Sequence, residues 1–230
     1  MPSTSPHTLQ VCRECGGGAP IDVHFCPQCT KILSLTRHGD YFDFFGLPRK
    51  LNIDLGDLER RFRALSRQFH PDFFYNATPA ERLASLERSS YLNDGYRTLH
   101  QPIARMEYLL KLEGLAPKSP EEASRQVPSS LLEEVFALNE ELDEVRAIRA
   151  GGAPADAWHG RLLQARQPIE ARRADHEARL QELATRWDGM DAAATDPARR
   201  DVLVALRDCF LERVYIANLL AVIERELETV

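Results

Sequence analysis

The stretch LGDLERRFRALSRQFHPD, which runs from Leu55 to Asp72, decides the fold of this 230-residue chain. Five apolar residues recur in it at steps of three and four: Leu55, Leu58, Phe62, Leu65 and Phe69. That spacing predicts one apolar stripe along a helix, and we expect the stripe to face a core. Pro71 has no backbone N–H and biases His70 away from helical angles, so the helix should end there. The loop that follows should expose an imidazole and a carboxylate to water.

The opposite side of this predicted helix is basic. At about 100° per residue, four arginines fall opposite the apolar stripe or on its flank: Arg60, Arg61, Arg63 and Arg67. A solvated surface is the usual role of such a face, and docking to an acidic partner surface is the alternative that the neighbouring loop favours. A catalytic pair of His70 and Asp72 is a third interpretation. It is disfavoured because an extended His70 should leave Asp72 poorly placed to orient the ring, and no oxyanion site or glycine-rich elbow is visible.

Capping signals predict two further helices after this loop. Thr78–Glu81 has the pattern of a capping box with proline at the first helical position, so a helix should run over about 79–100. Another should run from Pro102 to about residue 113, with Gly114 as its C-terminal cap. Residues 115–128 contain three prolines and few apolar side chains, which indicates a connector between domains.

The pattern beyond the connector is helical almost to the end of the chain. Ser130–Glu133 has the pattern of a second capping box, and the helix that it opens should close at Gly151-Gly152. A long polar helix is expected over about 155–188, and a last one from about Asp196-Pro197 to Glu228. Three helices of this length, joined by short turns, can bury a common face as a bundle.

The first helix of this bundle has two apolar lines. One should face the other two helices, and its members are Leu131, Val135, Leu138, Leu142 and Val145. Leu132 and Phe136 lie roughly 100–140° away from its centre, and Glu140 and Glu144 continue their line. An aromatic residue and a leucine off the core face, followed by carboxylates, can form a binding site for a partner protein. The alternative is that Leu132 and Phe136 pack under another part of the chain.

Four of the five cysteines form two Cys-x-x-Cys pairs, which are Cys12 with Cys15 and Cys26 with Cys29. This spacing indicates metal ligands in a reducing compartment rather than a disulfide framework. We expect a structural zinc ion, which should supply the folding free energy of a segment too short to bury a core. Rubredoxin-like iron fits the same ligands. A redox dithiol is less favoured, because it needs only one pair, at a helix start in a βαβ unit.

Composition limits the remaining functions. The chain is 43% hydrophobic and 28% charged, as a globular protein is, and its net charge of −6 argues against a nucleic-acid partner. No apolar run approaches the roughly 18 residues that span a bilayer, so no membrane partner is expected. Residues 1–11 have no signal or transit pattern, which predicts a cytoplasmic location; a mitochondrial one is the alternative if a transit peptide was removed.

A helix, an exposed His70-Pro71-Asp72 loop and a second helix resemble the J-domain of DnaJ-type co-chaperones. Tyr41–Pro48 is similar to the opening helix of that family, and Leu92–Leu99 to its third helix. The resemblance implies that the loop and the four arginines dock on a DnaK-type chaperone and accelerate its ATP hydrolysis, so that the chain itself is not an enzyme. Phe73 stands where a lysine is common in J-domains.

The second half of the chain resembles one particular family of J-domain proteins. Pro102–Leu112 leads through the connector into a helical bundle, an arrangement that resembles HscB, the co-chaperone of iron–sulfur cluster assembly. The similarity extends over nearly all of residues 38–230 and implies two partners, an HscA- or DnaK-type chaperone and an IscU-type cluster scaffold. Five residues match the scaffold-contact positions of that family: Leu132, Phe136, Glu140, Glu144 and Phe210.

We therefore expect an all-α fold in which a J-domain hairpin and a three-helix bundle follow a small zinc-ribbon or knuckle module. The expected boundaries are 1–36 for the module, 37–114 for the J-domain, 115–128 for the connector and 129–230 for the bundle. Two rivals remain: a J-domain protein with a different client on its bundle, and a metal-dependent redox or nucleic-acid protein built around the cysteines.

Overall fold

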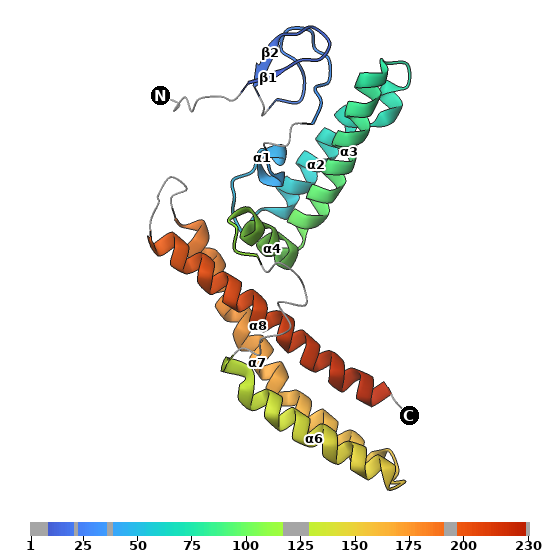
Figure 1. The fold of residues 1–230 in the computed structure, drawn as a ribbon, viewed down its shortest axis with the longest axis vertical. Helices are drawn as coiled ribbons and strands as arrows, with labels where there is room; N and C mark the ends of the chain where they lie inside the picture. Colours follow the sequence, from blue (N-terminus) through green and yellow to red (C-terminus); the bar gives the residue numbers. More distant parts are fainter. Residues whose placement is uncertain (1–8, 21–22, 36–38, 117–128, 191–196, 229–230) are drawn as a thin grey trace. The chain divides into compact units, whose positions relative to one another are not determined.

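The computed structural model describes residues 9–20, 23–35, 39–116, 129–190 and 197–228. The chain divides into two compact units, Met1–Arg105 and Met106–Val230. Helices dominate both units, as Figure 1 shows, and the strands of the described residues form one two-stranded sheet. The expected all-α class with a small N-terminal cysteine module is confirmed.

The first unit begins with the four-cysteine module, which is described over residues 9–20 and 23–35. Strands β1 (Leu9–Val11) and β2 (Gly18–Pro20) pair antiparallel there. The buried side chains of the module are few: Cys12, Ala19, Cys26 and Leu33. So small a core cannot by itself offset the entropy lost on folding, which agrees with a module that depends on a bound ion.

A helical hairpin follows the module. Helix α1 spans Tyr41–Phe45, α2 spans Leu55–Phe69 and α3 spans Pro79–His100, and α4 (Pro102–Leu112) crosses the boundary between the two units. α2 and α3 pack against each other, with the ring of Phe62 stacked on that of Tyr96 at 4.3 Å between centroids. The predicted stripe of α2 is buried at Leu58 and Phe69, whereas Leu55 is 41% exposed because it stands at the first position of the helix.

Local sequence signals set the ends of these helices. The predicted capping box of α3 is present: the Glu81 N–H donates to Thr78 Oγ1 at 3.3 Å, and the Thr78 N–H donates to the Glu81 carboxylate at 3.1 Å. Gly114 closes the chain after α4 in the left-handed conformation, with φ of 71°. Both predictions are confirmed, and the helix boundaries agree with those expected from the sequence.

The second unit contains a 3₁₀ turn at Ser129–Leu131 and three long helices, α6 (Leu132–Ala150), α7 (Asp156–Asp188) and α8 (Pro197–Glu228). α7 packs against both α6 and α8, as Figure 1 shows. The predicted inward stripe of α6 is confirmed, since four of its five members are buried and Val135 is partly buried. The turn between α6 and α7 uses Gly152 at φ of 76°, and α7 continues through Pro168.

One predicted cap is wrong. α6 begins at Leu132, after Leu131, which makes no side-chain capping bond, so Ser130–Glu133 is not a capping box. The Ser130 hydroxyl instead donates to the carboxylate of Glu212 on α8. Glu212 is only 7% exposed. A carboxylate that loses its water needs donors from the protein, and this need outweighs the capping bond.

Parts of the predicted organisation lie outside the described residues. These are residues 1–8, 21–22 and 36 of the expected module, 37–38 at the start of the next domain, 117–128 of the connector, and Asp196 before α8. Among the described helices, none has a stretch long and apolar enough to cross a bilayer.

Candidate functional site

The His70-Pro71-Asp72 loop lies where α2 ends. His70 caps the helix with φ of −58° and ψ of 127°, and Pro71–Phe74 forms a 3₁₀ turn. The side chain of Asp72 is 86% exposed and that of His70 is 52% exposed. The structure therefore presents both groups to solvent from a short, regular turn.

The placement of Asp72 differs from the expected one. The Asp72 N–H donates to His70 Nδ1 at 3.3 Å, and a carboxylate oxygen of Asp72 lies 3.4 Å from the same nitrogen. The extended His70 was expected to separate the two side chains, but the 3₁₀ turn after Pro71 brings Asp72 back beside the ring. The loop is thus held by a bond within itself, which limits the directions that both side chains can take.

The base of the loop is fixed from α3. Phe69, the residue before His70, is fully buried, and its carbonyl accepts hydrogen bonds from Ser85 Oγ at 2.7 Å and Ser89 Oγ at 2.9 Å. These two serines lie one turn apart on α3, so they reach the same acceptor. No local pattern in the sequence marks these two serines, because serine at this spacing is common on helix surfaces.

The basic face of α2 is partly neutralised. Arg60 and Arg61 both bond Asp57, at 3.1 Å and 2.7 Å, and Arg63 bonds a glutamate one turn earlier at 2.6 Å. Arg61 also donates to two main-chain carbonyls at the end of α1. Arg67 is exposed, and no hydrogen bond or ion pair involves it within the described part of the chain. The free positive charge of this face is therefore concentrated near the loop.

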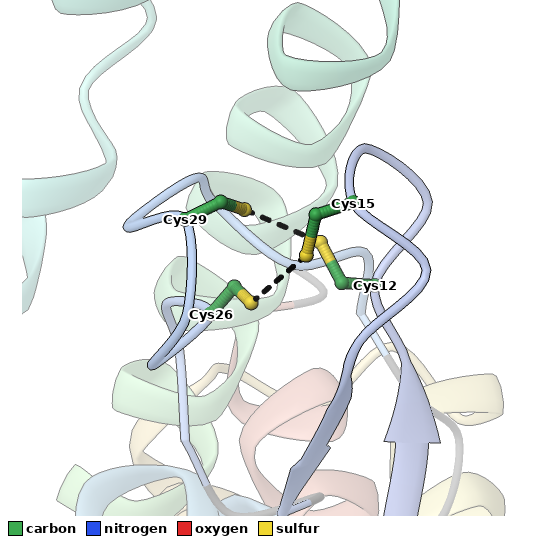
Figure 2. Close-up of side chains that lie close together, drawn as sticks. All are labelled: Cys12, Cys15, Cys26 and Cys29. Atoms are coloured by element: carbon green, nitrogen blue, oxygen red, sulfur yellow. Dashed lines mark hydrogen bonds between the residues drawn. The ribbon is translucent and has the colours of Figure 1, made fainter.

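The four cysteines of the module converge, as Figure 2 shows. All are free thiols, and their sulfurs lie within 4.8 Å of one another. Two sulfur–sulfur distances, Cys12 to Cys29 and Cys15 to Cys26, are both 3.7 Å. Sulfurs bound to zinc at about 2.3 Å in a tetrahedron would be about 3.8 Å apart. The geometry therefore fits a tetrahedral metal ion.

Each cysteine pair sits in a turn of the same form. The N–H of Gly16 donates to the Cys12 carbonyl, and the N–H of Thr30 to the Cys26 carbonyl, both at 2.9 Å. The residue after each pair is left-handed, with φ of 70° at Gly16 and 61° at Thr30. Two matching turns of this kind present two sulfurs each toward one point, as metal-binding knuckles require.

The pKa values of two of these thiols agree with a metal cation bound between the four sulfurs. The backbone N–H of Cys29 lowers the pKa of Cys26 to about 7. The N–H of Lys31 also favours the thiolate of Cys29, but burial and the other three sulfurs outweigh it and raise the pKa of Cys29 to about 12. Four thiols at this distance do not ionise together without a positive ion, and a bound metal supplies that charge.

The predicted binding face of α6 is largely exposed. Leu132 is 40% exposed and Phe136 is 69% exposed, and Glu140 follows one turn later, also exposed. Glu144 lies on the same line, but its carboxylate pairs with Arg161 of α7. Phe210 is 6% exposed on α8, so it does not share this open surface.

Comparison with known proteins identifies the family. No protein-family model matches the chain. The structure of chaperone HscB from Vibrio cholerae is 30% identical and aligns over 82% of this chain and 97% of that one, with a TM-score of 0.53. This chain belongs to the HscB family. Human co-chaperone HscB has the same fold, with a TM-score of 0.67 and 24% identity over 96% of this chain and 100% of that one.

The bundle of this HscB-family chain holds a buried polar cluster that the sequence did not reveal. His176 Nε2 lies 2.6 Å from the Cys209 carbonyl and 3.2 Å from its sulfur, and Glu212 is beside them. Burial raises the pKa of Cys209 to about 11. Arg172 and Arg179 lie 3.6 and 3.9 Å from the Glu212 carboxylate, so its charge is already balanced. The cluster is therefore a polar contact between α7 and α8.

Proposed function

We propose that this HscB-family chain is a J-domain co-chaperone of iron–sulfur cluster assembly. It stimulates ATP hydrolysis by an HscA- or DnaK-type chaperone and delivers an IscU-type scaffold to that chaperone. The proposed J-domain covers residues 37–114 and the proposed scaffold-binding bundle covers 129–230. The observation that supports this most directly is the exposed Asp72 on a loop that is fixed at its base.

The fixed loop favours docking for an entropic reason. The proline ring restricts one residue of the turn, the bond to His70 Nδ1 restricts Asp72, and two serines hold the carbonyl of Phe69. A loop already in its binding conformation loses little conformational freedom on association. Asp72 then offers a charged acceptor to donors of the chaperone, and Arg67 adds a positive charge three residues before the loop.

The exposed face of α6 supports the second half of the proposal. Leu132 and Phe136 give an apolar centre, and Glu140 gives a negative edge one turn further. A few central residues, often large aromatic ones, contribute most of the affinity of an interface, and charges at the rim set orientation and rate. We propose that this face, with Glu144 at its end, receives the scaffold.

We further propose that the four cysteines hold a structural zinc ion, with iron as the alternative. Cys12, Cys15, Cys26 and Cys29 have the spacing and donor set for either metal. The ion would supply the folding free energy that the small core of the module does not.

Substitution of Asp72 tests the proposal. Asp72→Asn keeps the size of the side chain and removes its charge, so ATPase stimulation of the cognate chaperone should fall to the basal rate while scaffold affinity stays unchanged. The measurement is steady-state ATP hydrolysis by the chaperone with and without scaffold, with calorimetric titration of the scaffold beside it. Stimulation by the Asp72→Asn variant equal to wild type would refute the role of the loop. Stimulation by the wild-type chain without any binding of an IscU-type protein would instead indicate a different client.

A further inference from the structure

A buried arginine links α3 to the four-cysteine module. Arg88 is 2% exposed, and its guanidinium forms hydrogen bonds with three residues of the module. Its Nε donates to the Leu33 carbonyl at 2.8 Å, its Nη1 donates to His24 Nδ1 at 2.7 Å, and its Nη2 donates to the Ser34 carbonyl at 3.4 Å. A guanidinium that is removed from water requires such acceptors, so α3 depends on the folded module.

The module also covers the base of the His70-Pro71-Asp72 loop. The ring of His24 packs edge-on against Phe69 and Phe44, both at 4.9 Å between centroids, and Phe25 lies 6.1 Å from Phe69. The guanidinium of Arg88 lies over the same Phe69 ring at 5.5 Å. Phe69 directly precedes the loop, so the side chain that anchors the loop contacts two rings of the module and a guanidinium that the module holds.

The N-terminal cap of α3, which follows the loop in the chain, contacts the same module. Glu14, which stands between two of the cysteines, accepts a hydrogen bond from Thr78 Oγ1 at 3.3 Å. Lys31 pairs with Glu81 at 3.0 Å, and Glu81 is 5% exposed. Thr78 and Glu81 form the capping box of α3. The module thus contacts the residue before the loop and the cap that follows it.

We propose that metal binding in the four-cysteine module positions the His70-Pro71-Asp72 loop, with His24 and Arg88 as the positioning residues. Without the ion, the small core of the module does not hold its fold, and Arg88 and Phe69 lose their partners together. The loop then opens at its base. The claim that the metal controls docking to a chaperone rests on the proposed function. The claim that the metal positions the loop does not.

Amide hydrogen exchange on the full chain tests the coupling without any substitution. Protein loaded with one equivalent of Zn²⁺ is compared with protein treated with a chelator. Exchange should become faster in the last turn of α2, in residues 69–75 and in the first turns of α3, while α6–α8 should not change. Faster exchange that is confined to residues 9–35 would overturn the proposal.

Linkage gives a second measurement. If metal binding stabilises the contacts of Arg88, removal of those contacts must weaken metal binding by the same factor. Arg88→Met should therefore lower the affinity for Zn²⁺, measured by competition with a chromophoric chelator, by about tenfold or more. Arg97→Met is the control, because Arg97 is an exposed arginine of the same helix, and it should leave the affinity unchanged. Equal affinities for wild type and Arg88→Met would refute the coupling.

The two proposals fail in distinguishable ways. Chelation should weaken binding of a DnaK-type chaperone at least tenfold and leave binding of the scaffold unchanged. If the metal-loaded chain binds no such chaperone, the proposed function is wrong, and the exchange and affinity results still decide the coupling. If the chaperone binds equally well with and without metal while exchange at residues 69–75 differs, the control of docking is refuted and only the structural coupling remains.

Discussion

Substitution of Phe136 by alanine tests whether this side chain binds a partner or packs in the core of the bundle. It is 69% exposed on α6, so about a third of the residue is buried. Removal of a fully buried phenylalanine costs about 3–5 kcal/mol, and a third of that is about 1–1.5 kcal/mol. Alanine also gains roughly 0.5 kcal/mol of helix propensity over phenylalanine. The Phe136→Ala variant should therefore lose less than about 1 kcal/mol of unfolding free energy.

The effect on scaffold binding should be larger. A central aromatic residue of an interface typically contributes about 2 kcal/mol or more, which corresponds to a loss of about 30-fold in affinity. Urea denaturation, followed by circular dichroism, gives the unfolding free energy, and calorimetric titration with an IscU-type scaffold gives the affinity. ATPase stimulation measured without scaffold should remain at the wild-type level.

Two control variants make the result interpretable. Leu163→Ala removes a leucine of α7 that is 50% exposed and lies outside the proposed binding face. By the same scaling it should cost about 1–2.5 kcal/mol of stability and leave the scaffold affinity unchanged. Leu138→Ala removes a residue of the same helix as Phe136 that is 3% exposed, and it should cost about 2–5 kcal/mol of stability. A loss of more than about 2 kcal/mol for Phe136→Ala, or an unchanged scaffold affinity, would refute the reasoning.

Three further predictions concern stability. Thr30 has φ of 61°, which disfavours a β-branched residue, so Thr30→Gly should stabilise the metal-loaded module by about 1 kcal/mol in thermal unfolding. A Cβ at Gly95 would lie 2.9 Å from a ring of α1, so Gly95→Ala should cost about 1–3 kcal/mol in urea, whereas Gly160→Ala, with open space around it, should gain about 0.5–1 kcal/mol. The hydrogen bond from Arg61 lowers the pKa of Asp57 below its usual value of 3.8. The folded state therefore binds this proton less readily than the unfolded state, and the stability that Asp57 contributes is lost as the pH falls below 3.8. Urea midpoints at pH 7 and pH 3 should therefore differ less in Asp57→Asn than in wild type.

Most of the helices could be predicted because their signals are local. The Thr78 capping box, the proline after His70 and the Gly114 cap each act within a few residues, and the structure confirms all three. The spacing of the cysteines likewise predicted their convergence, because two knuckles of this length can turn only a few ways. Local patterns of this kind are read directly from a single sequence.

The features that the sequence did not reveal mostly join residues far apart in the chain. Ser130 matched a capping box, but a buried carboxylate 82 residues away competes for its hydroxyl. The contact of His176 with Cys209 joins positions 33 residues apart, and neither position has a local pattern that marks it. The placement of Asp72 was missed for a different reason, since it depends on a 3₁₀ turn that a histidine–proline step permits but does not specify.

Three arginines of the first unit hold main-chain carbonyls. Arg61 donates to the end of α1, Arg88 to the four-cysteine module and Arg105 to the segment before α2. A planar guanidinium can satisfy several such acceptors at once, which a lysine ammonium does less well. A basic face inferred from sequence therefore overstates the charge that is available to a partner. Arg67, beside the loop, remains exposed, so electrostatic attraction toward a chaperone should be concentrated within a short distance of Asp72 rather than spread along α2.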